Sequence, residues 1–550
     1  MKKIILSLAI MVMASSLTAQ VSVWDGSYEE FDTSNERGLT EDNPILIENA
    51  AQLAHFSTLY FCSGEYQNKY FKLTTDVDLN NMEWQPIGGA HSHISCDGFD
   101  AHFDGDNHVI YQLTDALFAY STGSIENITV KESTFILDNY SNFGVITSGG
   151  VECKIENCHT YADIKIEGFE DYIDDIYVGS IAGGDLASVT IKNCTNHGNI
   201  DVDLKEAREN SRVVVCGIST GGTEVFNCQN YGNINIYSEA KNIGASGISS
   251  NVNQIAYCSN YGDINVNMTA GGDLIEMTCG GISPNFVGYP RKIISCFNKG
   301  DIVINVTGGT DESVIIGGGL VGKYLGGNDN LEIGINNGYN TGNVTINCSS
   351  GNSYAGGIIG LVPDNENEPV VNVRSCYNVG IIEAENIGGI LNIEKNAVAE
   401  IDNCFMLNVV ENNGYGESLA EDFMKSDEFV NMLNKYGKFF IKDTEPFVND
   451  GYPVIDYSDM NETINVDDVT INNNISVYPN PANDYVKVST ADGQQTTVRI
   501  YNTLGMLVET RLATSATNEI EINVSEYNPG IYFINISNEE SNVTKKIVIE

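Results

Sequence analysis

The chain is poor in positive charge. Its 550 residues include 28 Lys and Arg against 74 Asp and Glu, a net charge of −46. This excess of acid opposes binding to nucleic acid, whose phosphates are met by Lys and Arg, and to anionic membrane surfaces. Proline and tryptophan are also scarce, at 11 and 2 residues, whereas glycine is common at 54. With 42% hydrophobic residues, the composition allows a sizeable core and indicates many tight turns.

Patterns that support catalysis are sparse. The His-Glu-x-x-His sequence of zinc peptidases is absent. Acids are plentiful but scattered, and Arg212, Arg291 and Arg374 fall at different positions within the repeated units of the chain. A lyase or glycosidase needs a base and a charge stabiliser, or two carboxylates, converging on a groove, and no such set stands out.

Metal-binding patterns are weak, and we expect no dedicated cofactor. Cys-x-x-Cys pairs are absent, which disfavours zinc. One cluster contains residue types that bind transition metals, namely His91, His93, Cys96, Asp97, Asp100 and His102. The spacing of these residues matches no recognised metal site. Two Asp-x-Asp pairs could hold calcium loosely, although Asp also commonly closes turns; they are Asp76 with Asp78 and Asp104 with Asp106.

The N-terminus has the pattern of a secretory signal. Lys2 and Lys3 precede a short apolar run, and Leu17-Thr18-Ala19 is a plausible cleavage site, so residues 1–19 are predicted to be removed. No later segment reaches the roughly 18 apolar residues of a membrane helix, so we expect no transmembrane segment in the mature chain.

The C-terminal residues 475–550 consist of short alternating strands separated by turn sequences, which predicts a small Ig-like β-sandwich of about seven strands. The region closely resembles the type A C-terminal sorting domain of the type IX secretion system of Gram-negative bacteria. The resemblance rests on Pro479, Asn480, Pro481, Gly505, Pro529, Gly530, Lys545 and Lys546. It implies recognition by the secretion machinery at the outer membrane, with the cargo released or attached to the surface.

The middle of the chain repeats one unit about every 35 residues. An apolar strand ends in Cys, an Asn-x-Gly step follows, and then an alternating strand. The copies are Asn193–Val202, Asn227–Ile236, Tyr257–Val266, Ser295–Ile304, Gly338–Ile346 and Ser375–Ile382, with weaker ones at Asn157–Ile164 and Asn403–Phe405. A Gly-rich apolar element precedes each copy, as in Gly318–Gly322 and Gly356–Gly360. Short β-branched strands at this period predict an all-β fold, a parallel and right-handed β-solenoid.

Two repeated positions have a predicted structural role. The turn glycines are expected to adopt positive φ; they are Gly198, Gly232, Gly262, Gly300, Gly342 and Gly380. The Asn before each is expected to form a ladder between coils. The repeated cysteines are interpreted as an inward column of packed thiols, with disulfides and a metal site as alternatives; they are Cys158, Cys194, Cys228, Cys258, Cys296, Cys376 and Cys404.

Residues 41–410 resemble the Gly-Leu-Val-Gly, or GLUG, repeats of bacterial surface proteins. Val321 and Gly322 complete that motif best, and Tyr70–Leu79 and Phe103–Ile110 match the block that starts such solenoids. The resemblance implies a fold and a surface location but no chemistry.

The expected organisation follows from these features. It is a signal peptide (1–19), an N-terminal lead (20–40), the start of the solenoid with a helix capped by Asn49 (41–120), repeats (121–410), a C-terminal cap with a helix after Ser426 (411–460), a linker (461–474) and the sorting domain (475–550).

The function predicted is that of a secreted or cell-surface, non-catalytic solenoid, an adhesin or a glycan- or protein-binding module. The alternatives are a carbohydrate-active enzyme and a purely structural surface component. Variable segments between the strands, such as 204–211, 270–277, 308–313 and 364–369, suit a binding face. The 28 tyrosines would suit sugar stacking if their rings lay exposed on a flat sheet.

Overall fold

A computed structural model describes most of the chain. The described residues are 21–34, 37–59, 65–89, 98–137, 142–167, 175–184, 186–204, 212–240, 242–269, 275–287, 292–325, 334–364, 371–410, 413–458, 476–478, 482, 485–489, 496–502, 507–513, 519–525, 527, 530–537 and 542–549. The chain divides into two compact units, Met1–Tyr457 and Ser458–Glu550, and each is described by itself. The predicted signal peptide lies outside the described residues.

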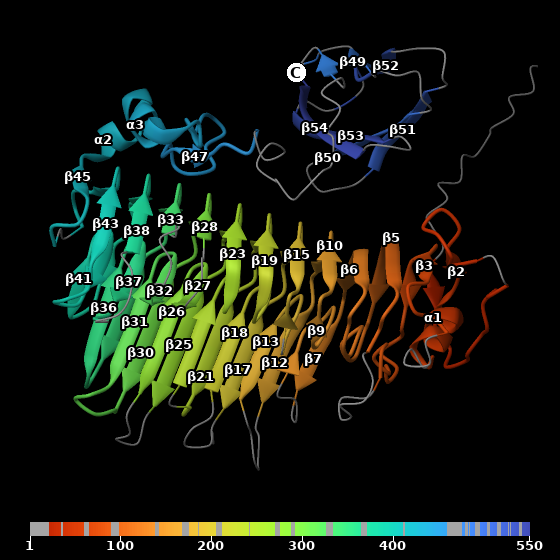
Figure 1. Cartoon of the computed structure of the whole chain (residues 1–550), viewed down its shortest axis with the longest axis horizontal. Helices are drawn as coiled ribbons and strands as arrows, with labels where there is room; N and C mark the ends of the chain where they lie inside the picture. Colours follow the sequence, from red (N-terminus) through yellow and green to blue (C-terminus); the bar gives the residue numbers. More distant parts are fainter. Residues whose placement is uncertain are drawn as a thin grey trace, which may run out of the picture. The chain divides into compact units, whose positions relative to one another are not determined.

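The first unit is a parallel β-solenoid of about eight turns, as the repeats predict (Figure 1). Beside a larger first sheet, two eight-stranded parallel sheets run along the solenoid, and they are called the second and third sheets. The second sheet contains β7 (Thr134–Leu137), β12 (Asp163–Glu167), β17 (Ile200–Leu204), β21 (Ile234–Ser238), β25 (Ile264–Thr269), β30 (Ile302–Thr307), β35 (Val344–Cys348) and β40 (Ile382–Glu383). The third sheet contains β8 (Asn142–Phe143), β13 (Ile176–Gly179), β18 (Arg212–Cys216), β22 (Asn242–Ser246), β26 (Glu276–Gly280), β31 (Val314–Gly318), β36 (Asn352–Gly356) and β41 (Asn386–Gly388).

The first sheet has 23 short strands, because most coils contribute one strand before the repeated Cys and a second strand after it. Its strands are β1 (Ser22–Val23), β2 (Ile45–Ile47), β3 (Tyr70–Leu73), β4 (Val77–Asp78), β5 (His102–Tyr111), β6 (Ser124–Lys131), β10 (Lys154–Glu156), β11 (His159–Thr160), β15 (Thr190–Lys192), β16 (Thr195–Asn196), β19 (Gly222–Phe226), β20 (Gln229–Asn230), β23 (Val252–Ala256), β24 (Ser259–Asn260), β28 (Lys292–Ile294), β29 (Phe297–Asn298), β33 (Gly334–Asn336), β34 (Tyr339–Asn340), β38 (Val371–Arg374), β39 (Tyr377–Asn378), β43 (Ala399–Asp402), β44 (Phe405–Leu407) and β45 (Glu417–Leu419).

A fourth sheet, which the repeat pattern did not predict, covers part of the third. It contains β27 (Ser283–Val287), β32 (Val321–Leu325), β37 (Ile359–Val362) and β42 (Leu391–Ile393). Contact between the sheets needs glycine, because a Cβ on Gly322 would lie 2.5 Å from Thr278 and from the Pro284 carbonyl. Thr278 on β26 and Ile316 on β31 are therefore buried. Among the described residues, the earlier coils show no such cover, and the short pair β9 (Gly150–Val151) and β14 (Leu186–Ala187) is the only additional sheet found there.

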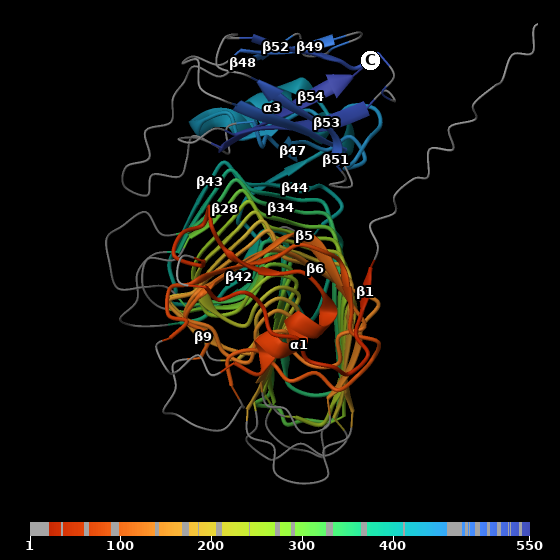
Figure 2. The same cartoon turned by 90° about the vertical axis from the view of Figure 1, so that its right-hand side faces the viewer.

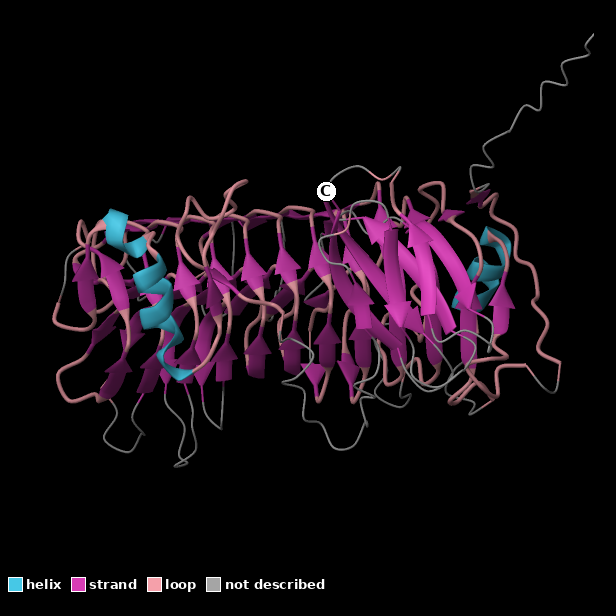
Figure 3. Ribbon diagram, turned by 90° about the horizontal axis from the view of Figure 1, so that it is seen from above, coloured by secondary structure: helices cyan, strands magenta, loops and turns pink. Residues whose placement is uncertain are grey.

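Helices lie at both ends of the solenoid (Figure 3). Seen along the coils, α1 (Ala50–Ser57) lies across the first of them (Figure 2), and Asn49 caps it by accepting a hydrogen bond from the Gln52 N–H. The far end has α2 (Glu421–Met424), α3 (Asp427–Leu433), the 3₁₀ turn η2 (Asn434–Tyr436), and the antiparallel pair β46 (Phe440–Ile441) and β47 (Val454–Ile455). Ser426 caps α3 as predicted, accepting from the Phe429 N–H.

A ladder of buried asparagines runs through the coils. Each Asn Nδ2 donates to the carbonyl of the glycine two residues later, and each except the last also donates to Oδ1 of the Asn in the next coil, at distances such as 2.8 Å for Asn230 to Asn260. The ladder comprises Asn196, Asn230, Asn260, Asn298, Asn340 and Asn378, all fully buried. The Gly-rich element makes room for it, since a Cβ on Gly247 would lie 2.1 Å from Asn260. The predicted ladder is thus confirmed.

The reason predicted for the turn glycines is wrong. None of the six is among the described residues with positive φ; that conformation occurs instead at the residue before the repeated Cys, as at Asn193 (φ 55°) and Asn227 (φ 50°). The turn glycines are needed because the coils approach closely. A Cβ on Gly232 would lie 1.8 Å from the Gly198 carbonyl, and one on Gly262 would lie 1.9 Å from the Gly232 carbonyl.

The second unit has seven antiparallel strands in two sheets. One contains β48 (Ser476–Tyr478), β49 (Tyr485–Ser489) and β52 (Glu519–Asn523). The other contains β50 (Thr496–Asn502), β51 (Leu507–Ala513), β53 (Gly530–Ser537) and β54 (Asn542–Ile549). Val486, Ile500 and Ile534 are among its buried core residues, which agrees with a small sandwich.

Candidate ligand-binding groove and placement of the predicted residues

The best candidate site is a groove of about 560 Å³ over the third sheet, in the coils that the fourth sheet does not cover. The outward side chains of β8, β13, β18 and β22 form its floor, with Tyr177, Val214 and Gly244 in register on neighbouring strands. Turns at Thr220–Gly221 and Ser250–Asn251 line it further. Its size lies within the usual range for ligand sites.

The groove is polar but locally balanced in charge. Among the residues that the structure describes, its lining contains one acid, Glu276, and one base, Arg212, although the whole chain has 74 acids against 28 Lys and Arg. Most of the other polar lining groups are amides and hydroxyls, from Asn142, Asn242, Asn251, Asn285, Thr220 and Ser250. Groups of this kind exchange hydrogen bonds with uncharged ligands rather than attracting ions.

Hydrogen bonds hold the groove's functional groups in place. The Tyr177 hydroxyl donates to Asp175 Oδ2 at 3.2 Å, and the same carboxylate accepts the Arg212 backbone N–H at 2.9 Å. Burial raises the pKa of Tyr177, and Asp175 raises it further. Glu276 forms an ion pair with Lys323 at 3.0 Å. Both carboxylates are therefore engaged by neighbours.

The exposed tyrosines differ from the flat platform that sugar stacking would require. Tyr161, His197, Tyr231 and Tyr261 from four successive coils form one stacked row, with centroids 4.2, 4.6 and 4.7 Å apart. Lys131 lies 4.9 Å from the Tyr161 ring, and Lys299 lies 5.7 Å from the Tyr261 ring. The ring faces are thus occupied and the edges face outward, so this row offers no free face to a sugar.

A second aromatic row is covered by the C-terminal cap. Phe297, Tyr339 and Tyr377 stack at 4.7 and 5.0 Å and are buried. The Tyr377 hydroxyl donates to the Pro453 carbonyl, and Asn449 Nδ2 donates to that hydroxyl at 2.9 Å. This row fixes the cap on the last coils and is unavailable to a ligand.

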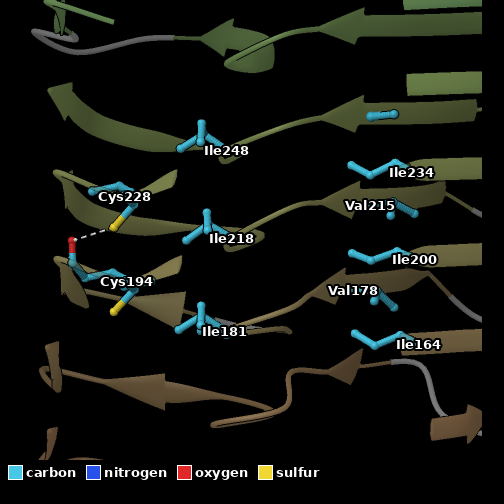
Figure 4. Close-up of a cluster of buried hydrophobic side chains, with 14 of the residues drawn as sticks. Ile164, Val178, Ile181, Cys194, Ile200, Val215, Ile218, Cys228, Ile234 and Ile248 are labelled. Carbon is cyan, nitrogen blue, oxygen red and sulfur yellow. Dashed lines mark hydrogen bonds between the residues drawn. The ribbon is translucent and has the colours of Figure 1, made fainter. Parts of the chain in front are cut away.

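The seven repeated cysteines are buried, unpaired thiols inside the coils. Figure 4 shows Cys194 and Cys228 stacked in the same orientation beside Ile181 and Ile218. Parallel side chains of this kind suit a disulfide poorly. Each thiol instead contacts a carbonyl two residues earlier, as Cys228 Sγ does with Phe226 O at 3.3 Å. Where Gly338 replaces the cysteine, a Cβ there would lie 2.7 Å from Leu320, so the Leu320 side chain fills the gap.

Burial also predicts how the cysteines outside the repeated position react. It raises the pKa of Cys153, Cys216 and Cys279 to about 12, which keeps them protonated and unreactive. Of the eleven described cysteines, Cys348 alone is partly exposed. Iodoacetamide at about pH 8 should therefore modify Cys348 in the native protein and the other ten only after denaturation, as mapped by peptide mass spectrometry. Native labelling of Cys228 or Cys258, or a disulfide between them, would contradict the buried column.

The four aspartates of the two Asp-x-Asp pairs form ion pairs or hydrogen bonds with other groups of the protein. Lys72 Nζ lies 3.4 Å from Asp104 and 3.0 Å from Asp106. Asp76 accepts from His108 Nδ1 at 2.9 Å, and Asp78 accepts from the Asn80 N–H. His102 stacks on Tyr70, while His91, His93, Cys96 and Asp97 lie outside the described residues. Within the described part of the chain, no three His, Cys, Asp or Glu side chains gather as metal ligands.

The three arginines noted in the sequence do not converge. Arg212 lines the groove, Arg374 packs 5.0 Å from the Tyr436 ring in the far cap, and Arg291 lies outside the described residues.

One serine has the spacing of a catalytic nucleophile. Gly217-Ile-Ser219-Thr-Gly221 matches the Gly-x-Ser-x-Gly elbow, which needs an exposed serine on a strand-to-helix turn. Ser219 is instead fully buried, 2.9 Å from the Ser249 hydroxyl, and the chain continues into strand β19. The match to the Gly-x-Ser-x-Gly pattern therefore arises from the glycine-rich element of the repeat and does not mark a nucleophile.

Sequence reasoning missed the groove. Tyr177, Asn242 and Glu276 line the groove from positions that vary between repeats, and the groove exists because the fourth sheet begins only at β27. Of the predicted sorting residues, Gly530 begins β53 and Lys545 and Lys546 lie in β54, whereas Pro479, Asn480, Pro481, Gly505 and Pro529 lie outside the described residues.

Comparison with known families identifies the end of the chain. Residues 476–550 match the secretion system C-terminal sorting domain family. No curated protein matches the chain. The sorting domain implies interaction with the type IX secretion machinery, and either secretion or attachment to the outer-membrane surface. No helix in the described part of the chain is long and apolar enough to cross a membrane.

Proposed function

We propose that this exported β-solenoid is a non-catalytic glycan-binding module, an adhesin of the GLUG type, and that the groove over β8, β13, β18 and β22 is its ligand site. The observation that carries the proposal is that the described lining residues are balanced in charge and supply mainly amides, hydroxyls and one tyrosine, in a chain with a net charge of −46. A neutral, hydroxyl-rich ligand fits this lining better than an ion or an apolar molecule.

The glycine pattern supports the likeness to GLUG repeats. In Gly319-Leu-Val-Gly322 the first glycine makes room for Asn340 of the ladder, and the last lets the fourth sheet lie on the third. The motif is therefore a packing device, which agrees with a resemblance that implies fold rather than chemistry.

A carbohydrate-active enzyme is the main alternative. It would need two free carboxylates, or a base and a charge stabiliser, at the groove. Asp175 is held by Tyr177 and the Arg212 backbone, and Glu276 by Lys323. These bonds favour a binding role over hydrolysis or elimination.

The test uses the mature protein and a panel of neutral linear oligosaccharides with β-1,4-linked glucose, xylose or mannose. At least one series should bind, and Tyr177→Ala should weaken that binding about tenfold or more, because the variant removes the aromatic side chain from the groove floor. Tyr237→Ala, which changes an exposed tyrosine on the second sheet, is the matched control and should bind as the wild type does.

Two results would overturn this function. One is binding that is indifferent to Tyr177→Ala. The other is release of reducing sugar from a bound oligosaccharide, which would favour the enzyme.

A further inference from the structure

The groove is blocked at one end by the outermost strand of the fourth sheet. The outward positions of the third sheet run in register from Tyr177 through Val214 and Gly244 to Thr278. At Gly244 the floor meets Pro284 of β27, whose side chain lies 3.6 Å from where a Cβ would stand. Thr278, one strand further on, lies under the fourth sheet, where a Cβ on Gly322 of β32 would stand 2.5 Å from it. A ligand lying along the floor therefore meets a wall at β27.

Strand β27, which forms this wall, is suited to contact a ligand through its side chains rather than to pair with an added strand. β27 is the edge of its sheet, beside β26 in Figure 1. The Ser283 N–H donates to Leu320 O in the neighbouring coil, and the next residue of this edge strand is Pro284. Proline has no N–H, which protects an edge from an added strand. A peptide partner bound by strand addition is therefore disfavoured here.

Polar groups gather where the floor ends. Asn285 lines the groove beside Pro284, and Glu276 lies there with its carboxylate paired to Lys323. The amide both donates and accepts, while the carboxylate accepts. Together they can bind several hydroxyls presented by one sugar ring.

The length of the open floor sets the size of the ligand. Four strands, β8, β13, β18 and β22, form it, and parallel strands lie about 4.8 Å apart. One sugar of an extended β-linked chain is of similar length, so a chain lying across the strands would place about one sugar on each coil.

From this geometry, and resting on the glycan-binding function above, we infer that the groove captures the end of a neutral glycan chain. The terminal sugar lies against β27 and binds Asn285 and Glu276, and about three further sugars extend over β18, β13 and β8. Internal stretches of a long chain are excluded, because a chain cannot continue past β27.

The experiment is calorimetric titration of the mature protein with the β-1,4-linked glucose, xylose and mannose series, from disaccharides to octasaccharides, and with the matching soluble polymers. For the series that binds, affinity should rise up to about the tetrasaccharide and then level off. One protein should bind per chain for every length, including the polymer. Asn285→Ala should weaken binding about tenfold, whereas Asn347→Ala, on the exposed second-sheet ladder, should not.

These outcomes distinguish the failure of end capture from the failure of glycan binding itself. If the polymer binds many protein molecules per chain, or if Asn285→Ala binds as the wild type does, end capture is wrong while glycan binding stands. If no series binds, the proposed function fails first, and the inference fails with it.

Discussion

Replacing Gly262 by alanine is expected to prevent the solenoid from reaching its native state. A Cβ on this residue would lie 1.9 Å from the Gly232 carbonyl oxygen in the preceding coil. Only backbone movement relieves such a contact, and in a stack that movement passes to every neighbouring coil. We expect a loss of at least about 3 kcal/mol in unfolding free energy, measured by urea unfolding of the mature chain.

The matched control is Gly221→Ala. At Gly221 the nearest atoms to an added Cβ lie 3.5 Å away, so this variant should unfold at nearly the wild-type urea concentration. Failure of Gly262→Ala to accumulate as folded protein while Gly221→Ala does so would support the account. Equal midpoints for Gly262→Ala and the wild type would refute the close approach of the coils.

Truncating one rung of the asparagine ladder should have the second large effect. Asn260 Nδ2 donates to Gly262 O at 2.8 Å and to Asn298 Oδ1 at 2.7 Å, and Asn260 Oδ1 accepts from Asn230. In Asn260→Ala these groups lose their partners at a position that is fully buried in the native fold. Each unsatisfied group costs about 1–3 kcal/mol, so we expect a total loss of about 3–5 kcal/mol in unfolding free energy.

The second sheet offers a matched control for this loss. Asn265 Nδ2 donates to Asn235 Oδ1 at 3.0 Å in a similar ladder that is only partly buried. Because water replaces the lost bond there, Asn265→Ala should cost about 0.5 kcal/mol or less. If the two variants unfold at the same urea concentration, the buried ladder is not what stabilises the coils.

Much of the scaffold could be predicted because the repeat is a physical requirement. Coils that stack in parallel need the same residue type at the same place, so the Asn ladder was readable from sequence, as was the parallel order of the strands. The caps at Asn49 and Ser426 were readable because capping uses local chemistry. The role of the turn glycines could not be predicted, because glycine is selected both by a close approach to the neighbouring coil and by a left-handed conformation.

The groove could not be predicted because it depends on where the fourth sheet begins. Gly244 and Ile316 occupy equivalent outward positions on third-sheet strands, yet the floor is open before β27 and covered after it. The elements Gly280–Ile282 and Ser246–Ile248 look alike in sequence, and only the longer path after the first creates β27. That difference falls in variable segments, where the repeat carries no information.

Hydrogen exchange tests the central claim, that the open third sheet is the ligand site, most directly. The mature protein is exchanged with and without a saturating amount of its best-binding neutral oligosaccharide, and peptides are compared by mass spectrometry. The account predicts slower exchange in peptides containing β13, β18, β22 and the start of β27, and no change in β30 or β35. Protection confined to the second sheet or to the row of Tyr161, His197, Tyr231 and Tyr261 would contradict it.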